Sequence, residues 1–190
     1  MAPCRSPLAS YRVELATLFT IGHSTRTLDG LIETLQAHSI QTLVDIRSFP
    51  MSRRLPHFNR ETLENTFPTH GIQYVWMKDL GGRRKKSVED SPNLALRNDS
   101  FRNYADYMLT PEFERAVADL IKLAEHSPIA YMCAERVYFR CHRMLLSDWL
   151  VAHGHEVLHI DDAKPPRPHT VMQEAQLIHG QLIYRGDRLI

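Results

Sequence analysis

The sequence predicts a single-domain α/β protein with a mostly parallel, Rossmann-like sheet and helices on both of its faces. Short apolar segments alternate along the chain with longer segments whose apolar residues recur at helical spacing. Such an alternation implies parallel strands joined by right-handed crossovers. The length agrees, because 190 residues suffice for one well-buried domain but are few for two. We therefore expect residues 1–190 to form one domain that ends in a small hairpin.

The first half of the chain predicts two helices between three strands. The strands are expected at residues 18–21, 41–46 and 71–77. Thr27 has a side chain suited to cap the first helix, and Asn59 is expected to cap the second, which should end near Pro68. Residues 78–100 then exceed the usual length of a connection, which favours a binding loop or a mobile flap.

The second half continues the alternation. Helices are expected at residues 111–125 and 142–153, and strands at 128–133 and 156–160. Thr110-Pro111 is a helix-start signal and Gly154 a helix-stop signal. Residues 164–169 form a proline-rich arm, and residues 176–184 predict a hairpin that turns at His179-Gly180.

Composition limits the class of protein. Hydrophobic residues make up 43% of the chain and charged residues 24%, which is typical of a globular domain. No apolar run approaches the roughly 20 residues of a membrane span, and the N-terminus lacks the apolar core of a secretion signal, so we expect a cytoplasmic protein without membrane association. Three cysteines in a reducing compartment favour thiols or metal ligands over structural disulfides.

Reactive side chains are concentrated between Cys133 and Arg143. This stretch holds two cysteines, a carboxylate, an imidazole and three guanidiniums. It joins a predicted strand to a predicted helix, and ligands bind beyond the carboxyl ends of parallel strands, where helix N-termini attract anions. A thiol at this position should have a depressed pKa and a raised nucleophilicity.

Polar residues also follow the first two strands, so the three strand ends should converge on one cleft. The expected strand order places the first strand centrally, with the second and fourth beside it. We expect Cys133 to act as nucleophile, His23 or His142 to carry the proton, and Asp45 and Glu135 to orient them. The residues expected to bind substrate are Arg47 and Arg143 as an anion clamp, with Ser24, Cys141, Arg53 and Arg54.

Basic residues recur in three loops at the same edge of the sheet. They are Arg53, Arg54 and Arg60 after the second strand, residues 83–86 after the third, and Arg136, Arg140 and Arg143 after the fourth. The net charge is only +1, so this local concentration indicates an anionic partner, either a small molecule or a nucleic acid. The preferred hypothesis is a cysteine-dependent hydrolase or transferase acting on a phosphorylated or nucleotide-like substrate.

Three alternatives stay open. The protein is either this enzyme or a non-catalytic nucleic-acid or nucleotide binding module. Phe58, Tyr138 and Phe139 either stack on bases or pack their loops into the core. Cys133 is alternatively a buried small hydrophobe that closes its strand. Cys133, Cys141, His142 and His23 also form a possible ligand set for zinc or iron, although seven residues between the cysteines exceed the usual zinc-knuckle spacing. The sequence identifies no cofactor and no oligomeric state.

Five short motifs resemble the family of domains of unknown function numbered 488 (DUF488). They are Thr20-Ile21-Gly22-His23-Ser24, Val44-Asp45-Ile46-Arg47, Pro56-His57-Phe58-Asn59, Leu80-Gly81-Gly82, and Cys133-Ala134-Glu135 with Cys141-His142-Arg143. The resemblance covers about residues 17–162, with the arm and tail hairpin at 163–190. It implies an α/β fold and no settled reaction. Family members often carry an acidic, proline-containing spacer between the two cysteine motifs, whereas this chain has Arg136-Val137-Tyr138-Phe139-Arg140 there.

Overall fold

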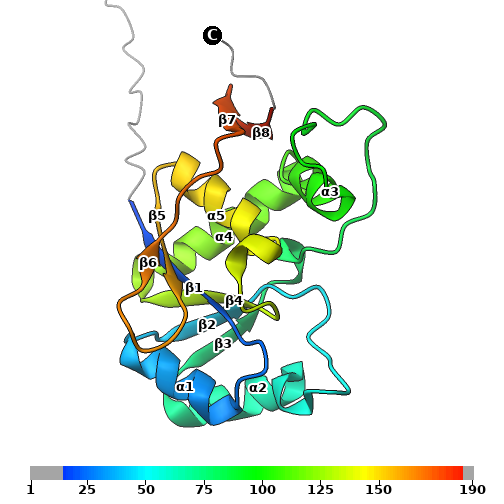
Figure 1. Cartoon of the computed structure of the whole chain (residues 1–190). Helices are drawn as coiled ribbons and strands as arrows, with labels where there is room; N and C mark the ends of the chain where they lie inside the picture. Colours follow the sequence, from blue (N-terminus) through cyan, green and yellow to red (C-terminus); the bar gives the residue numbers. More distant parts are fainter. Residues whose placement is uncertain (1–14, 186–190) are drawn as a thin grey trace, which may run out of the picture.

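A computed structural model describes residues 15–185 and has the predicted α/β architecture. The main sheet has six strands in the order β3-β2-β4-β1-β5-β6, and a separate antiparallel pair, β7-β8, forms the C-terminal hairpin (Figure 1). The strands are β1 (Thr17–Gly22), β2 (Thr42–Asp45), β3 (Gln73–Trp76), β4 (Ile129–Cys133), β5 (Glu156–Ile160), β6 (Arg167–Pro168), β7 (Ala175–Ile178) and β8 (Gln181–Tyr184). The first five strands run parallel, and β6 is antiparallel to β5.

Helices cover both faces of the sheet, as Figure 1 shows. The α-helices are α1 (Leu28–Ala37), α2 (Arg60–Thr66), α3 (Asp99–Tyr107), α4 (Pro111–His126) and α5 (Arg143–Ala152). Four short 3-10 turns are η1 (Pro56–Phe58), η2 (Phe67–His70), η3 (Lys78–Leu80) and η4 (Tyr138–Arg140).

The core has two parts, one on each face of the sheet. Side chains of a strand alternate between faces, and in β4 Tyr131 packs with α3, α4 and α5, while Met132 packs with α1 and α2. The five residues of β4 are all buried, as expected for a strand at the centre of a sheet covered on both sides.

The strand order differs from the expected one in a single respect. β4 lies between β1 and β2, so β2 is hydrogen-bonded to β4 and not to β1. The connection from β1 through α1 to β2 therefore passes over β4. The carboxyl ends still meet at one edge, because Gly22 lies opposite Cys133 and Asp45 lies opposite Met132.

One of the two predicted helix caps forms, because the hydroxyl of Thr27 accepts a hydrogen bond from the backbone N–H of Gly30. Thr110, expected with Pro111 to start a helix, also caps α4, since its hydroxyl accepts from the backbone N–H of Phe113. Asn59 occupies the N-cap position of α2, as expected, but its side chain does not cap the helix. Its side-chain oxygen accepts from the backbone N–H of Ser52 at 2.6 Å and braces the preceding loop instead.

The proline-rich arm and the C-terminal hairpin also form regular structure. The proline-rich arm contributes β6, an edge strand, where proline is tolerated. In the hairpin turn, His179 and Gly180 both have positive φ angles, 49° and 81°, as the predicted tight turn requires. The side chain of Asn93 donates to Asp106 and accepts from the backbone N–H of Tyr184, so the 81–98 loop connects α3 to the hairpin.

Helix α3 was not assigned from the sequence, although Asn98 caps it through the backbone N–H groups of Ser100 and Phe101. The described residues include no helix with the length and apolar character needed to cross a bilayer.

Candidate active site

Cys133 is the last residue of β4, and the residue is 8% exposed. The backbone of the following loop passes directly over the end of β1. A Cβ atom on Gly22 would lie only 1.9 Å from the carbonyl oxygen of Glu135, so only glycine allows this close approach. The backbone N–H of His23 then donates to the carbonyl of Cys133, which fixes the loop against β1.

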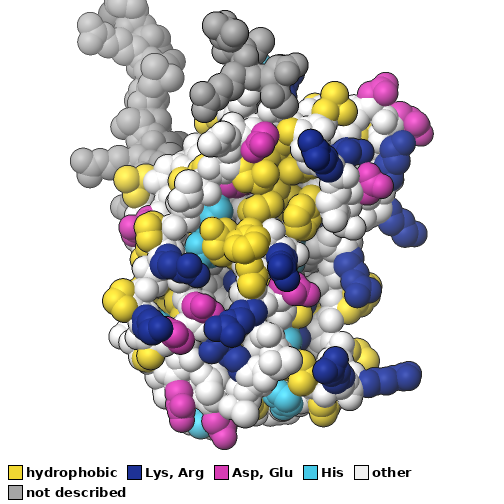
Figure 2. Space-filling view, in the orientation of Figure 1, with side chains coloured by type: hydrophobic (Ala, Val, Ile, Leu, Met, Phe, Trp, Pro, Cys, Tyr) yellow, Lys and Arg dark blue, Asp and Glu magenta, His cyan; other side chains and the backbone are white. Residues whose placement is uncertain are grey.

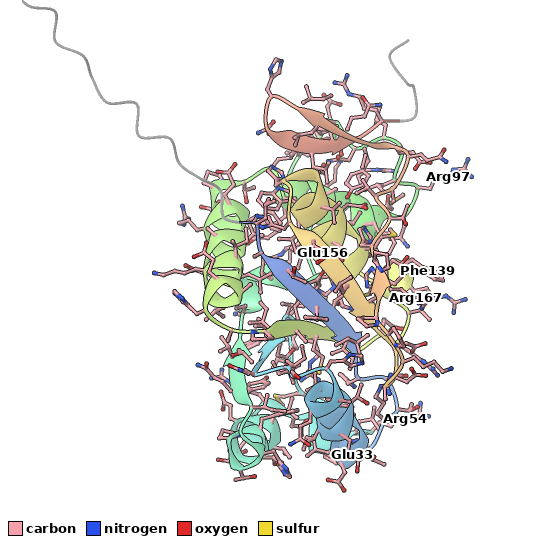
Figure 3. The ribbon with its side chains drawn as sticks, turned by 90° about the vertical axis from the view of Figure 1, so that its left-hand side faces the viewer. Glu33, Arg54, Arg97, Phe139, Glu156 and Arg167 are labelled. Carbon is pink, nitrogen blue, oxygen red and sulfur yellow. The ribbon has the colours of Figure 1, made fainter. Side chains whose placement is uncertain are left out.

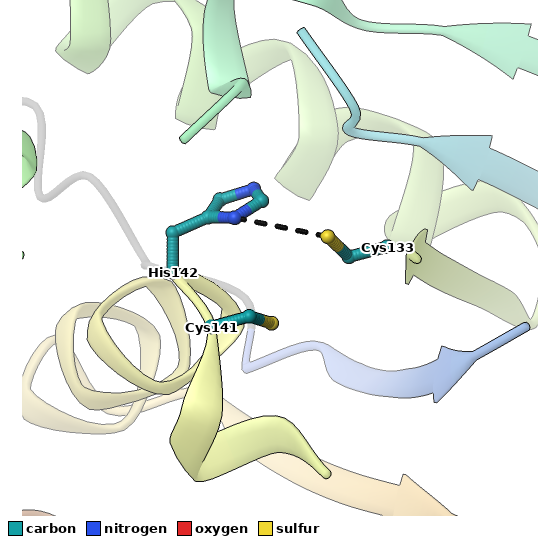
Figure 4. Close-up of side chains that lie close together, drawn as sticks. All are labelled: Cys133, Cys141 and His142. Atoms are coloured by element: carbon teal, nitrogen blue, oxygen red, sulfur yellow. Dashed lines mark hydrogen bonds between the residues drawn. The ribbon is translucent and has the colours of Figure 1, made fainter. Parts of the chain in front are cut away.

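Cys133, Cys141 and His142 form a compact buried group at the start of α5 (Figure 4). Their sulfur and nitrogen atoms all lie within 4.8 Å of one another. The Nδ1 atom of His142 lies 3.9 Å from the Sγ atom of Cys133. The sequence predicts the same three residues at this strand-loop-helix turn, and the structure brings them together.

The pKa values of the two thiols are shifted in opposite directions. A hydrogen bond from the Cys141 thiol lowers the pKa of Cys133 to about 7, helped by the charge of Arg143 and by the backbone N–H groups of Glu135 and Ala134, which together outweigh the effect of burial. The same hydrogen bond, with burial, raises the pKa of Cys141 to about 12. Cys133 therefore carries the thiolate near neutral pH, and Cys141 stays protonated and donates to it.

The hydrogen bonds of His142 define its tautomer. Its Nε2 atom lies 3.2 Å from the carbonyl oxygen of Ile46, which can only accept, so Nε2 carries the proton. In the neutral ring, Nδ1 is then unprotonated and faces Cys133. Tyr104 packs edge-on against the imidazole at 5.1 Å, and a Cβ atom on Gly82 would lie 2.5 Å from the ring. The ring is thus held by its neighbours in an orientation that presents a base to the thiol.

His23 is held in a different network with Asp45 and Arg47. The guanidinium of Arg47 pairs with the buried carboxylate of Asp45 and also donates to Nε2 of His23 at 3.2 Å. Nδ1 of His23 must then donate to the carbonyl of Ser24, at 3.0 Å. Burial and the charge of Arg47 lower the pKa of His23 to about 4, so the ring is neutral and both nitrogens are engaged.

Arg143 also has its donors occupied. It is 1% exposed and donates to the sulfur of Cys141, the hydroxyl of Thr20 and the carbonyls of Glu135 and Arg136. Its charge acts on Cys133 through space, while its side chain holds the 134–142 loop in place.

A cavity of about 440 Å³ opens over Cys133, which we call the Cys133 pocket. It is lined by Arg47, Ser48, Phe49, Gly82, Arg83, Ser100, Phe101, Cys133, Ala134, Glu135, Arg140, Cys141 and His142. Two of these, Arg83 and Arg140, are exposed arginines that form no ion pair with any described residue. A larger cavity of about 490 Å³, between residues 86–94 and α3, contains neither cysteine nor histidine.

The other predicted site residues do not belong to the buried group of Cys133, Cys141 and His142. Ser24 has a positive φ of 49° and its backbone N–H donates to Ala134, but it does not line the Cys133 pocket. Glu135 lines the pocket with an exposed side chain. Arg53 and Arg54 are exposed outside the pocket, and in Figure 3 Arg54 points away from the domain near α1.

The Cys133 group also has the composition of a metal site. Two cysteine sulfurs and one imidazole nitrogen are typical ligands for zinc, and three protein ligands leave a fourth coordination position open. His23 does not belong to this group, because Nε2 of His23 accepts from Arg47.

Sequence reasoning missed several parts of the pocket. The carbonyl of Ile46 orients His142, and the 81–98 loop brings Gly82 and Arg83 to the site. Tyr74 donates to Asp45 at 2.7 Å and supports the Arg47 network from β3. The Leu80-Gly81-Gly82 motif was the one available signal for the loop contribution.

Comparison with family models finds a match to the model described as "Domain of unknown function DUF488", over residues 27–150. Neither the curated proteins nor the solved structures include one that matches the chain.

Proposed function

The chain belongs to the DUF488 family, whose function is unknown, and from its geometry we propose a cysteine-dependent hydrolase or transferase acting on a phosphorylated or nucleotide-like anion. The observation that carries this proposal is the Cys133–His142 pair. The thiol lies 3.9 Å from an imidazole nitrogen that is left unprotonated by the hydrogen bond to Ile46. Nucleophile, base and orienting group are the three parts of a covalent catalyst.

The chemistry follows from these three parts. Nδ1 of His142 takes the proton of the Cys133 thiol, and the sulfur forms a bond to the electrophilic phosphorus of the substrate. The bond to the leaving oxygen breaks, and His142 returns its proton to that oxygen. Nδ1 of His142 then takes the proton of water, or of an acceptor hydroxyl, as that oxygen bonds to phosphorus and the phosphorus–sulfur bond breaks. His142 returns this proton to the departing sulfur, which restores the thiol and gives hydrolysis or transfer respectively.

Arg83 and Arg140 are the cations best placed to hold the substrate anion. They line the Cys133 pocket and form no ion pair with the described residues, so their guanidiniums are available. Arg47 and Arg143, the expected clamp, have their donors committed to Asp45, His23 and backbone carbonyls. We assign these two arginines to positioning and not to substrate binding.

The test is hydrolysis of p-nitrophenyl phosphate, combined with iodoacetamide labelling of each cysteine read by mass spectrometry. Cys133 should label with an apparent pKa near 7, against about 8.5 for an ordinary thiol. Adenosine monophosphate should protect it. We expect Cys133→Ser to abolish turnover and His142→Ala to reduce it by about 10²-fold or more, the usual contribution of a general base.

A matched pair of arginine variants provides the control. Arg83→Ser with Arg140→Ser should remove protection by adenosine monophosphate and leave the labelling rate of the free protein unchanged. Arg53→Ser with Arg54→Ser, outside the pocket, should leave both quantities unchanged. Labelling of Cys133 at the rate of an ordinary thiol, without protection, would refute the proposal.

A nucleic-acid binding module is the second candidate, supported by one observation. Phe49 is 66% exposed at the rim of the Cys133 pocket, and the guanidinium of Arg83 lies 5.8 Å from its ring centroid. Replacing residues 83–86 with serines should then weaken binding of single-stranded oligonucleotides. The log-log salt slope should fall by about 0.7 for each phosphate that the variant no longer neutralises. An unchanged slope would exclude these residues from such an interface.

A further inference from the structure

A second cavity, which we call the His159 pocket, shares no lining residue with the Cys133 pocket. Its volume is about 420 Å³, within the roughly 300 to 1,000 Å³ typical of small-molecule sites. Segments from η4, the start of α5, the end of β5 and β6 line it. Phe139 and Arg167, two of its lining residues, extend outward on the same side of the molecule in Figure 3.

Positive charge dominates this pocket. Arg136, Arg143 and Arg167 line it, and Asp161 is the one carboxylate among its lining residues. Asp161 pairs with Arg136 at 3.0 Å, whereas Arg167 forms no ion pair with any residue between 15 and 185. Figure 2 shows lysine and arginine side chains around a hydrophobic group on the face near β6. An excess of arginine in a cavity favours an anionic ligand.

A buried chain of polar side chains ends at this pocket. The carboxylate of Asp148 accepts hydrogen bonds from the hydroxyl of Tyr184 at 3.0 Å, the backbone N–H of Met172 at 3.0 Å and Nε2 of His169 at 2.8 Å. Nδ1 of His169 lies 2.9 Å from Nε2 of His159. Each link contains one donor and one acceptor, so the carboxylate sets the proton positions along the whole chain.

This series of hydrogen bonds from Asp148 to His159 leaves one ring nitrogen, Nδ1 of His159, without a partner. Asp148 accepts from Nε2–H of His169, so in the neutral ring Nδ1 of His169 accepts from Nε2–H of His159. His159 then carries a bare lone pair on Nδ1. This is the single buried side-chain nitrogen or oxygen among the described residues that has no hydrogen-bond partner. A buried acceptor without a donor is costly to maintain, which points to a ligand that supplies the donor.

Tyr138 covers the imidazole of His159. The two rings are stacked, 3.6 Å apart at an angle of 11°, and the Tyr138 hydroxyl has no hydrogen bond to the described part of the chain. Nδ1 of His159 is buried, so a ligand reaches it only if the wall of the pocket moves, and Tyr138, in the single 3-10 turn η4, is part of that wall. Tyr138 and Phe139 also give the pocket an aromatic wall.

We propose that the His159 pocket binds a small phosphorylated hydroxy compound, with its phosphate on Arg167 and Arg136 and a hydroxyl donating to Nδ1 of His159. Binding there needs no reaction at Cys133. The ligand would lie against Arg143, whose Nε donates to the sulfur of Cys141 at 3.4 Å. Arg143 therefore connects a ligand in the His159 pocket to the thiols of Cys133 and Cys141, although the two pockets are separate.

Calorimetric titration of the full chain carrying Cys133→Ser tests the proposal without interference from the reaction. The probes are glycerol phosphate, inorganic phosphate and glycerol. We expect glycerol phosphate to bind most tightly, because it alone supplies both the anion and the hydroxyl donor. Arg167→Ser should weaken its binding at least about tenfold, the effect of removing one charge-assisted hydrogen bond. Arg53→Ser, an exposed arginine outside both pockets, is the matched control and should have no effect.

The nitrogen-15 resonance of His159 provides a second readout. In the free protein Nδ1 should have the shift of an unprotonated nitrogen, and glycerol phosphate should move that resonance. No detectable binding, equal affinity for inorganic phosphate and glycerol phosphate, or an unmoved Nδ1 resonance would overturn the proposal. A loss of affinity in Arg83→Ser and not in Arg167→Ser would also overturn it, because the ligand would then occupy the Cys133 pocket.

Discussion

The histidines beside Cys133 differ in the partners of their ring nitrogens. His142 donates through Nε2 to a carbonyl and keeps Nδ1 free for the thiol. His23 accepts from Arg47 at Nε2 and donates to the carbonyl of Ser24 at Nδ1, so it has no free nitrogen. The sequence left both as candidates for the proton carrier, because residue types and spacing do not show which hydrogen bonds each ring forms.

The acidity of Cys133 should depend on the hydroxyl or thiol at position 141. The hydrogen bond from Cys141 is the largest of the effects that lower the pKa of Cys133 to about 7. Cys141→Ala removes that donor, so the pKa should rise toward the ordinary value of about 8.5, and labelling at pH 7 should slow several-fold. Cys141→Ser keeps a donor and should keep most of the shift. The measurement is the iodoacetamide labelling rate of Cys133 against pH.

The sign of this pH dependence follows from the reactive species. The thiolate reacts, so the rate rises with pH through the pKa and levels off above it. Cys141→Ala should move the midpoint of this rise upward. An unmoved midpoint in Cys141→Ala would mean that Arg143 and the backbone N–H groups alone set the acidity of Cys133.

Zinc should compete for the same atoms. Cys133, Cys141 and His142 present three ligand atoms within 4.8 Å of one another, and zinc binds thiolates and imidazoles. We expect micromolar Zn²⁺ to block labelling of Cys133, and EDTA to restore it. Cys141→Ala should weaken this block more than Arg53→Ser, which removes no ligand. A block that persists unchanged in Cys141→Ala would exclude this three-ligand site.

The element that carries the site, from β4 through the loop to α5, was predictable. Its strand is a continuous apolar run, and its helix repeats apolar residues at helical spacing, with Leu146 fully buried and Trp149 packed against the core. The 81–98 loop was not predictable in shape, because its position depends on hydrogen bonds to distant residues such as Asp106 and Tyr184. The part of the pocket wall that this loop supplies was therefore not foreseen.

Gly82 links that loop to the Cys133–His142 pair. A Cβ atom at position 82 would lie 2.5 Å from the imidazole of His142, so Gly82→Ala must displace the ring or the loop. We expect turnover to fall at least about tenfold, because small misplacements of a catalytic group are costly. The thermal midpoint serves as a check that the variant folds.

A double-mutant cycle separates this effect from general damage. If Gly82→Ala acts by moving His142, then adding it to His142→Ala should cause little further loss, since neighbouring residues that act through one group are not additive. Fully additive losses would show that Gly82 affects turnover by another route.

At the scale of the whole molecule, the fold class was predictable and the strand order was not. Alternating strands and helices specify a parallel sheet, but nothing in the local pattern determines which strand lies between which. The ends of β1, β2 and β4 meet at one edge as expected, because parallel strands end at the same edge in either order. The expected single cleft is not formed, because His23, Asp45 and Arg143 do not line the Cys133 pocket and Arg143 lines the His159 pocket. The buried chain from Asp148 to His159 could not be foreseen, because it joins side chains from α5, β5 and the segment after β6.

The C-terminal hairpin should unfold together with the domain. Tyr184 of β8 is fully buried, donates to the carboxylate of Asp148 in α5 and pairs through its backbone with Asn93 and Ala95. Tyr184→Phe removes the hydroxyl and leaves Asp148 with one donor fewer, so the free energy of unfolding should fall by about 1 to 3 kcal/mol. Leu177→Ala, at a half-exposed position of β7, should change it by less than about 0.5 kcal/mol.

Urea unfolding followed by circular dichroism and by tryptophan fluorescence should give one coincident transition for the wild-type chain. Separate transitions, with Tyr184→Phe affecting only the earlier one, would show that the hairpin is an independent unit and that residues 15–185 do not fold as one domain.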